Sequence, residues 1–240
     1  MDSSVAERLR GRVLVLTGAG ISVASGIAPF RGDGGLYEGL NPYELASPRA
    51  FAARPVTVWN WYLMRIHQGL SAKPNPGHTA LAEMDSLVDA LTLVTSNVDE
   101  LHEQAGSPEV FHLHGRILHF LCSGCRKVTP MPIFDLPEKV DEESIFRCDC
   151  GWLLRPNVVW FGESPWEKAV AAALDGIQNA DAVIEVGSSG AVTYGFAEEA
   201  AQRGKFVLRI NPEPDPHRGI ELWTEKAEVA LPQLVGWLRS

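Results

Sequence analysis

A glycine turn near the amino terminus has the composition of a phosphate-binding loop. Gly18 and Gly20 follow an apolar run at residues 13–16, so a buried strand is expected to lead directly into the turn. Such a turn lets backbone N–H groups approach a pyrophosphate closely. Hydride-transferring enzymes usually have a third glycine three residues after the second, where this chain has Val23. The turn therefore predicts a dinucleotide site that differs from the site of a common dehydrogenase.

Two apolar runs later in the chain are each followed by polar side chains. These side chains are of the types that transfer protons and position ligands. Asn97 and Asp99 come just after one run, and alternation along an extended segment places both side chains on one side. His112 and His114 follow at a second apparent strand end. We favour His114 as the proton acceptor, because the adjacent Gly115 would permit close approach of a ligand. A single asparagine or histidine in such places more often completes a turn or packs in the core, so the hypothesis depends on the whole group.

The four cysteines are clustered in one short part of the chain. Cys122 and Cys125 have the two-residue spacer of a zinc knuckle, and Cys148 and Cys150 follow with a spacer of one residue. This clustering favours a local metal site over a dispersed disulfide framework. Four thiolates would bind one structural Zn²⁺ tetrahedrally and leave no open position for catalysis. Free cysteines or a redox pair are the alternative interpretation.

Short apolar runs alternate with helical patterns over most of the chain. Strands are expected at residues 13–16, 91–95, 183–186 and 206–210. Helices are expected at residues 76–84, 167–177, 197–203 and 231–238. This alternation predicts an α/β fold class, with a Rossmann-type doubly wound parallel sheet. Ligands of such a sheet bind at the carboxyl ends of the strands, where the glycine turn and the polar side chains fall.

Two segments interrupt this alternation. Residues 40–77 are rich in Trp, Tyr, Pro and Arg and are interpreted as a helical insertion. Residues 118–152 contain the cysteines and are interpreted as a small zinc-binding module. The main domain is then discontinuous and comprises residues 1–39, 78–117 and 153–240.

Composition excludes several classes of partner. The 240 residues are 45% hydrophobic, which is enough to bury a full core. Acidic residues outnumber basic ones by 30 to 21, and the resulting net charge of -9 argues against nucleic acid as a partner. No apolar stretch approaches the ~18 residues of a membrane span, and no signal peptide is recognisable. We therefore expect a cytoplasmic protein that binds neither nucleic acid nor membrane.

In their order and spacing, these motifs resemble the sirtuin family of NAD-dependent protein-lysine deacylases. The matching segments extend over nearly the whole chain: residues 18–22, 25–27, 30–31, 97–102, 114–115, the four cysteines, and residues 154–163, 186–189 and 210–213. The resemblance implies that NAD is consumed as a co-substrate and that an acyl-lysine peptide enters the cleft between the domains. The acyl oxygen would attack the ribose as nicotinamide leaves, and the products would be nicotinamide, O-acyl-ADP-ribose and free lysine.

The resemblance also implies roles for residues at matching positions. His114 would be the general base, Asn97 would position the ribose or a water, and Asp99 would hold the nicotinamide amide. The full set of residues expected to contact NAD is Gly18, Ala19, Gly20, Ile21, Ser22, Phe30, Arg31, Ser96, Asn97, Val98, Asp99, Gly187, Ser188, Ser189, Asn211, Glu213 and Ala227.

A second implied set of residues would bind the acylated peptide. Val159, Phe161 and Gly162 would pair with the peptide backbone as an added strand. Tyr62 and Arg65 are three residues apart and share one face of a helix, where a phenol and a guanidinium can hold a carboxylate. This pair resembles the Tyr-x-x-Arg signature of bacterial-type sirtuins that remove succinyl and malonyl groups, although the same spacing is common on solvated helices. We therefore expect removal of succinyl and malonyl as well as acetyl groups.

The chain departs from the family pattern at several positions. Ser96 stands where glutamine is usual, and Ser188 replaces a usual threonine. Residues 193–195 are Thr-Tyr-Gly rather than Tyr-Pro-Ala, and residues 28–29 are Ala-Pro rather than Pro-Asp. None of these departures removes a candidate catalytic side chain. Mono-ADP-ribosyl transfer and non-catalytic sensing of NAD or ADP-ribose are the alternative functions.

Overall fold

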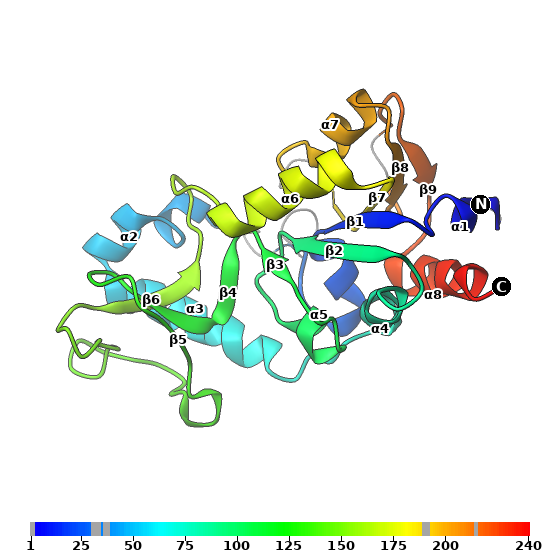
Figure 1. Cartoon of the computed structure of the whole chain (residues 1–240). Helices are drawn as coiled ribbons and strands as arrows, with labels where there is room; N and C mark the ends of the chain where they lie inside the picture. The colour runs from blue at the N-terminus through cyan, green and yellow to red at the C-terminus, as the bar shows by residue number, and fades with distance from the viewer. Residues whose placement is uncertain (1–2, 30–34, 36–38, 189–192, 214–215) are drawn as a thin grey trace.

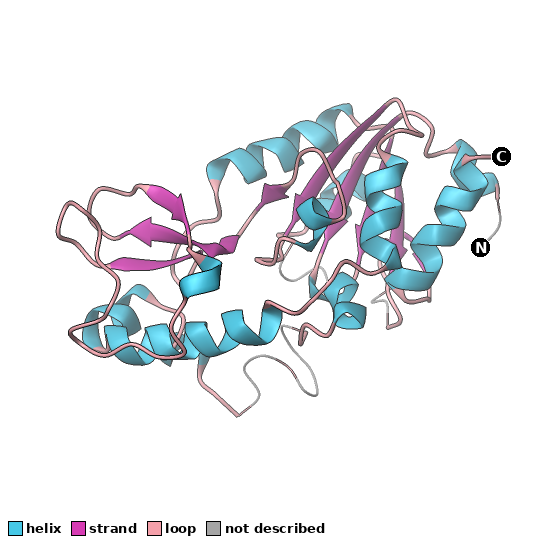
Figure 2. Ribbon diagram, turned by 90° about the horizontal axis from the view of Figure 1, so that it is seen from below, coloured by secondary structure: helices cyan, strands magenta, loops and turns pink. Residues whose placement is uncertain are grey.

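The chain folds into a larger and a smaller unit that lie side by side (Figure 1). The computed structural model describes residues 3–29, 35, 39–188, 193–213 and 216–240. The larger unit is a six-stranded parallel sheet with helices on both faces. The smaller unit is a three-stranded antiparallel sheet flanked by two helices, as Figure 2 shows from below.

The parallel sheet confirms the predicted fold class. Its strands lie in the order β3-β2-β1-β7-β8-β9. Their bounds are β1 Arg12–Thr17, β2 Ala90–Thr95, β3 Phe111–His112, β7 Ala182–Val186, β8 Phe206–Ile210 and β9 Glu221–Trp223. The four predicted strands are confirmed to within one residue at each end. Strands β3 and β9 were not predicted, because they have only two and three residues and are too short to show an apolar pattern.

Alternate side chains of the central strands enter two separate cores. Leu14 and Leu16 of β1 pack toward α6 (Glu167–Asn179) and α7 (Phe196–Gln202). Val13 and Val15 pack toward the opposite layer, whose helices are α1 Ser4–Glu7, α4 Pro76–Met84 and α8 Ala227–Leu238. Helix α8 begins four residues earlier than predicted, and Pro232 lies inside it. Among the described residues, no helix has the length and apolar composition to cross a membrane.

The direction of winding reverses between β1 and β7. From β1 the chain continues to β2 and β3 on one side, and β7, β8 and β9 extend the sheet on the other. The carboxyl ends of β1 and β7 are adjacent, since Thr17 pairs with Val186. A switch point of this kind is where doubly wound sheets bind ligands.

The smaller unit contains both predicted insertions. Its sheet has the order β5-β4-β6, with β4 Gly115–Cys122, β5 Val128–Pro130 and β6 Leu154–Val158, and its helices are α2 Pro48–Ala53 and α3 Pro55–Gly69. Trp59 of α3, Phe120 of β4 and Ile145 of the cysteine module belong to one core. Residues 154–158 form the third strand of this small sheet, although the sequence assigned them to the main domain. The sequence did not reveal this strand pairing because the partner, β4, is distant in sequence.

Candidate active site

Two glycine turns meet at the switch point, one after β1 and one after β7. Gly18 N–H donates to the Val186 carbonyl (2.9 Å), and Gly20 N–H donates to the Gly187 carbonyl (2.9 Å). A Cβ on Gly18 would lie 2.7 Å from the Gly187 oxygen, and one on Gly20 would lie 2.7 Å from Gly187 Cα. These glycines are therefore required by close packing of two backbone turns. Both N–H groups donate within the protein, so the close approach of the two turns is a reason for these glycines that the sequence did not reveal. The contact of this turn with a pyrophosphate stays a prediction.

Ser22 joins the two polar residues of the loop after β2. Its hydroxyl donates to Asp99 Oδ2 (3.0 Å) and accepts from Asn97 Nδ2 (3.2 Å), which also donates to the Gly18 carbonyl (3.2 Å). Asn97 and Asp99 thus face the same side of the loop, as expected. Burial raises the pKa of Asp99, although hydrogen bonds from Leu101 N–H and Ser22 act against the rise. Among the described contacts, the Asn97 amide oxygen is left to accept from a ligand.

A buried histidine, His78, contacts Ser22. It was not among the site residues predicted from the sequence. Asn75 N–H donates to His78 Nδ1 (3.3 Å), so the ring proton is on Nε2, which lies 3.4 Å from Ser22 Oγ. Asn75 also donates to the Ile21 carbonyl (2.7 Å) and caps helix α4. Burial lowers the pKa of His78 to about 4, so the ring stays neutral near neutral pH. The Asn-Pro-Gly-His sequence is a helix-capping signal that could have revealed this pair.

His114 lies in the turn between β3 and β4 with a defined tautomer. Its Nδ1–H donates to the Ser96 carbonyl (2.9 Å), so Nε2 is the unprotonated nitrogen, and the Tyr194 hydroxyl lies 3.0 Å from it. Burial lowers the pKa of His114, although the bond to Ser96 acts to raise it. A Cβ on Gly115, which has φ +79°, would lie 2.1 Å from the Asn157 oxygen. Gly115 is therefore needed for the approach of this backbone and not of a ligand.

The other histidine of the pair fixes the loop after β2 without lining the cavity. His112 is buried between the Asn97 carbonyl, 3.0 Å from Nδ1, and Glu103 Oε1, 2.8 Å from Nε2. Burial acts to raise the pKa of Glu103, but the hydrogen bond and charge of His112 lower it below its usual value. Both ring nitrogens face oxygen acceptors, so the two contacts fix the orientation of the ring.

A cavity of about 340 Å³ brings most of the predicted residues together. Its walls come from the glycine turn, the loops after β2 and β3, helix α3 and the segment after β6. The predicted residues that line it are Ala19, Ser22, Tyr62, Arg65, Ser96, Asn97, Val98, Asp99, His114, Val159, Phe161 and Gly162. Tyr194 and Glu163, which the site prediction did not include, line it as well.

Tyr62 and Arg65 occupy the wall that helix α3 contributes. Tyr62 is fully buried, and its hydroxyl accepts from Trp160 Nε1 (2.9 Å). Burial raises the pKa of Tyr62, although nearby Arg65 acts to lower it, so the phenol is neutral and can donate. The Arg65 guanidinium lies over the Trp61 ring, 4.6 Å from its centre. Both residues line the same cavity as His114.

The segment after β6 is held by an ion pair between buried Arg155 and half-buried Glu163. Arg155 makes two hydrogen bonds to Glu163, at 2.6 and 2.9 Å, and its guanidinium lies 3.3 Å from the centre of the Trp160 ring. Val159 N–H donates to the His114 carbonyl (2.8 Å), and Phe161 N–H donates to the Ala46 carbonyl. A peptide that pairs with this segment must therefore use other backbone groups, such as those of exposed Gly162.

The residues predicted for the adenosine side lie outside this cavity. Asn211 Nδ2 donates to the Ser188 carbonyl (2.9 Å), which ties the end of β8 to the turn that begins at Gly187. Glu213 N–H donates to Asn211 Oδ1 (3.3 Å), whereas Ala227 is buried in the first turn of α8. The predicted residues Phe30, Arg31 and Ser189 lie outside the described part of the chain.

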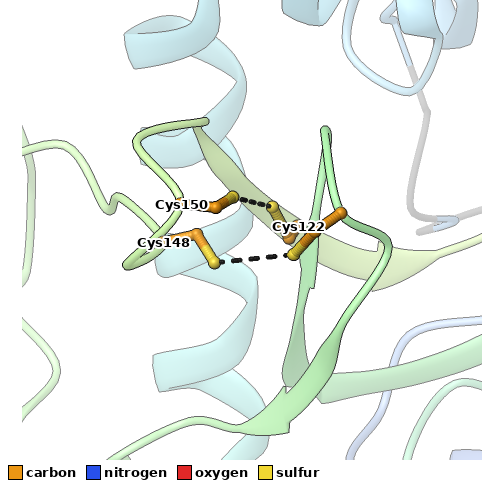
Figure 3. Close-up of side chains that lie close together, drawn as sticks. Cys122, Cys148 and Cys150 are labelled. Atoms are coloured by element: carbon orange, nitrogen blue, oxygen red, sulfur yellow. Dashed lines mark hydrogen bonds between the residues drawn. The ribbon is translucent and has the colours of Figure 1, made fainter.

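The four cysteines converge from two turns of the small unit (Figure 3). The Cys122 and Cys150 sulfurs are 3.4 Å apart, those of Cys125 and Cys148 are 3.8 Å apart, and all four lie within 4.8 Å of one another. Sulfurs at about 2.3 Å from a tetrahedral zinc ion are about 3.8 Å apart, so this set fits Zn²⁺. Four protein ligands would complete the coordination, which defines a structural site.

Comparison with known proteins identifies the family. The Sir2 family model matches residues 18–194, and the chain belongs to the Sir2 family. A protein named NAD-dependent protein deacylase from Mycobacterium tuberculosis is 41% identical over 234 residues, covering 93% of this chain and 96% of that protein. NAD-dependent protein deacylase 1 from Archaeoglobus fulgidus is 40% identical over 207 residues, covering 85% of this chain and 82% of that protein.

Solved structures agree with this assignment. A Sir2 homologue in complex with ADP-ribose superimposes with a TM-score of 0.90 at 36% identity, covering 100% of this chain and 97% of that one. A Sir2 homologue in complex with NAD gives a TM-score of 0.85 at 36% identity, covering 100% and 94%. Both complexes contain an adenine nucleotide, which is the kind of ligand that the switch point of a doubly wound sheet is suited to bind.

Proposed function

We propose that this protein is an NAD-dependent protein-lysine deacylase whose acyl pocket favours chains that end in a carboxylate, such as succinyl and malonyl, and also accepts acetyl. The family and the relatives named deacylases support the general activity. One observation carries the acyl preference: Tyr62 and Arg65 line the same cavity as His114. We place the enzyme in the cytoplasm, where reduced cysteines can bind zinc.

The pocket has the chemistry of a carboxylate site. Arg65 supplies a permanent positive charge with paired donors, and Tyr62 supplies a neutral hydroxyl whose proton can point toward a ligand. The rings of Trp61 and Trp160 lie beside this pair, and their low polarity strengthens its attraction for an anion. An acetyl group would occupy the same space without offering a carboxylate to the guanidinium.

The polar wall of the cavity is suited to the sirtuin reaction. NAD supplies the ribose carbon that the acyl oxygen attacks, with nicotinamide as the leaving group. His114, neutral and with Nε2 unprotonated, can take a proton from a ribose hydroxyl during acyl transfer. The Asn97 amide oxygen would orient the ribose, and Asp99, which accepts from Ser22, would hold the nicotinamide amide. The work of these residues is mainly positioning and exclusion of water.

The decisive experiment compares matched peptides. The protein is incubated with NAD and with acetyl-, malonyl- or succinyl-lysine peptides of one sequence, and mass spectrometry identifies the products. We expect nicotinamide, O-acyl-ADP-ribose and free lysine, with a higher kcat/KM for the succinyl peptide. Arg65→Met should lower the succinyl kcat/KM about 10- to 100-fold and change the acetyl value little, since hydrogen bonds to charged groups contribute about 1.5–3 kcal/mol.

A matched control separates the pocket from general charge effects. Arg49 is an exposed arginine of the same helical insertion and does not line the cavity, so Arg49→Met should leave both reactions unchanged. Equal losses on succinyl and acetyl peptides in Arg65→Met would refute the acyl preference. An ADP-ribosylated peptide as the main product would favour mono-ADP-ribosyl transfer instead.

A further inference from the structure

The proton-accepting nitrogen of His114 already has a partner within the protein. Because Nδ1–H donates to the Ser96 carbonyl, Nε2 can only accept, and the Tyr194 hydroxyl donates to it over 3.0 Å. The two rings are 5.9 Å apart between centres. Under the proposed function, this is the nitrogen that must receive a proton from the co-substrate ribose. Tyr194 therefore occupies the position that a reacting hydroxyl needs.

The backbone that presents Tyr194 is held in an uncommon conformation. Tyr194 has φ +55° and Gly195 has φ +72°, so two successive residues are left-handed, which is unfavourable for a bulky side chain. The preceding Thr193 is buried, and its hydroxyl donates to Glu185 Oε1 (2.8 Å). Glu185 is itself paired with buried Arg209 at 2.6 Å.

This buried network explains why the tyrosine is placed over His114. The Arg209–Glu185 pair lies under the carboxyl end of the sheet and anchors Thr193, which fixes the start of the left-handed turn. Gly195 completes the turn and leads directly into α7.

We infer that Tyr194 is a positioning residue that competes with the ribose hydroxyl of NAD for His114 Nε2. In the free protein the tyrosine hydroxyl orients the imidazole ring and protects its lone pair from solvent. When the nucleotide binds, its hydroxyl replaces that of Tyr194, which is half-exposed and can hydrogen-bond to water instead. The inference rests on the proposed function for the identity of the competing ligand, but not for the Tyr194–His114 contact.

The test is Tyr194→Phe, with binding measured apart from turnover. We expect this variant to bind ADP-ribose about 3- to 10-fold more tightly by calorimetry, because a hydrogen bond of about 0.5–1.5 kcal/mol no longer has to be exchanged. KM for NAD should fall by a similar factor, with kcat changed less than about twofold. Tyr43→Phe is the matched control, because Tyr43 is an exposed tyrosine beside Phe161 that does not line the cavity.

A second readout does not depend on activity. NMR titration of the His114 ring should show a higher pKa in Tyr194→Phe than in the unmodified protein, because a donor to Nε2 favours the neutral ring. In the part of the chain that the structure describes, the other titratable or charged groups lining the cavity with His114 are Tyr62, Arg65, Asp99 and Glu163, and the substitution leaves them in place.

The outcomes distinguish the inference from the proposed function. Unchanged or weaker ADP-ribose binding in Tyr194→Phe, or an unchanged His114 pKa, would overturn the inference even in an active deacylase. A protein that releases no nicotinamide with any acylated peptide would refute the proposed function, while the NMR titration would still decide whether Tyr194 holds His114.

Discussion

The two walls of the cavity are built on different principles. On the wall formed by the parallel sheet, Ser22, Asn97 and Asp99 already bond to one another and are supported from behind by His78. The wall formed by the small unit is aromatic and carries Arg65 beside its rings. The polar groups of the sheet wall are therefore fixed by one another before a ligand binds. The aromatic wall supplies apolar surface and hydrogen-bond donors to a ligand.

This difference separates chemistry from selectivity. Fixed polar groups do not have to reorganise during the reaction, which is the arrangement that stabilises a developing charge most effectively. Under the proposed function the aromatic wall takes no part in proton transfer, so substitutions there should change which acyl chain fits without altering the reaction. We therefore expect changes on the sheet wall to affect all acyl substrates alike, and changes on the other wall to affect them unequally.

The largest expected effect is on the sheet wall, at His114. Substitution of His114 by Ala should lower kcat/KM about 10²- to 10⁴-fold for succinyl and acetyl peptides alike, because general base catalysis contributes that range. Calorimetry with ADP-ribose should show that the variant still binds nucleotide. A loss confined to one acyl class would contradict the division between the two walls.

The buried histidine behind Ser22 should make the sheet wall sensitive to acid. The pKa of His78 is about 4 in the folded protein and about 6.5 when unfolded, so the unfolded chain binds more protons between these values. Its contribution to stability is present above pH 6.5 and is lost as the pH falls toward 4. Between pH 7 and pH 4.5 the free energy of unfolding should fall by about 2 kcal/mol more in the unmodified protein than in the His78→Gln variant.

Urea unfolding at several pH values measures this difference. Asp99 has a raised pKa and acts in the opposite direction, since its protonation favours the folded state at low pH. Comparison with His78→Gln removes that contribution, because both proteins retain Asp99. Parallel stability curves for the two proteins would show that His78 does not titrate as the structure indicates.

The elements of the fold were more predictable from the sequence than the partners of the site residues. The strand at residues 13–16 was recognisable because it is a continuous apolar run that ends in a glycine turn. His114 was recognisable by its place after a strand, but its contact with Tyr194, 80 residues later, depends on where α7 packs. The reason given for Gly115 was wrong for the same cause, because the close neighbour is Asn157 of a strand distant in sequence. Contacts between distant segments leave no periodic pattern in a sequence.

The smallest expected effect among these substitutions is on the aromatic wall, at Tyr62. Tyr62→Phe removes one donor from the acyl pocket and keeps Arg65, so the succinyl kcat/KM should fall about 10-fold while the acetyl value changes less than about threefold. The substitution also leaves Trp160 Nε1 without its acceptor, which should cost about 1–3 kcal/mol of unfolding free energy. Urea unfolding measures this cost separately, and assays are made where both proteins are fully folded. Because Tyr62 is buried against Trp160, a purely structural role would lower both activities together, whereas a role in binding carboxylate lowers the succinyl reaction alone.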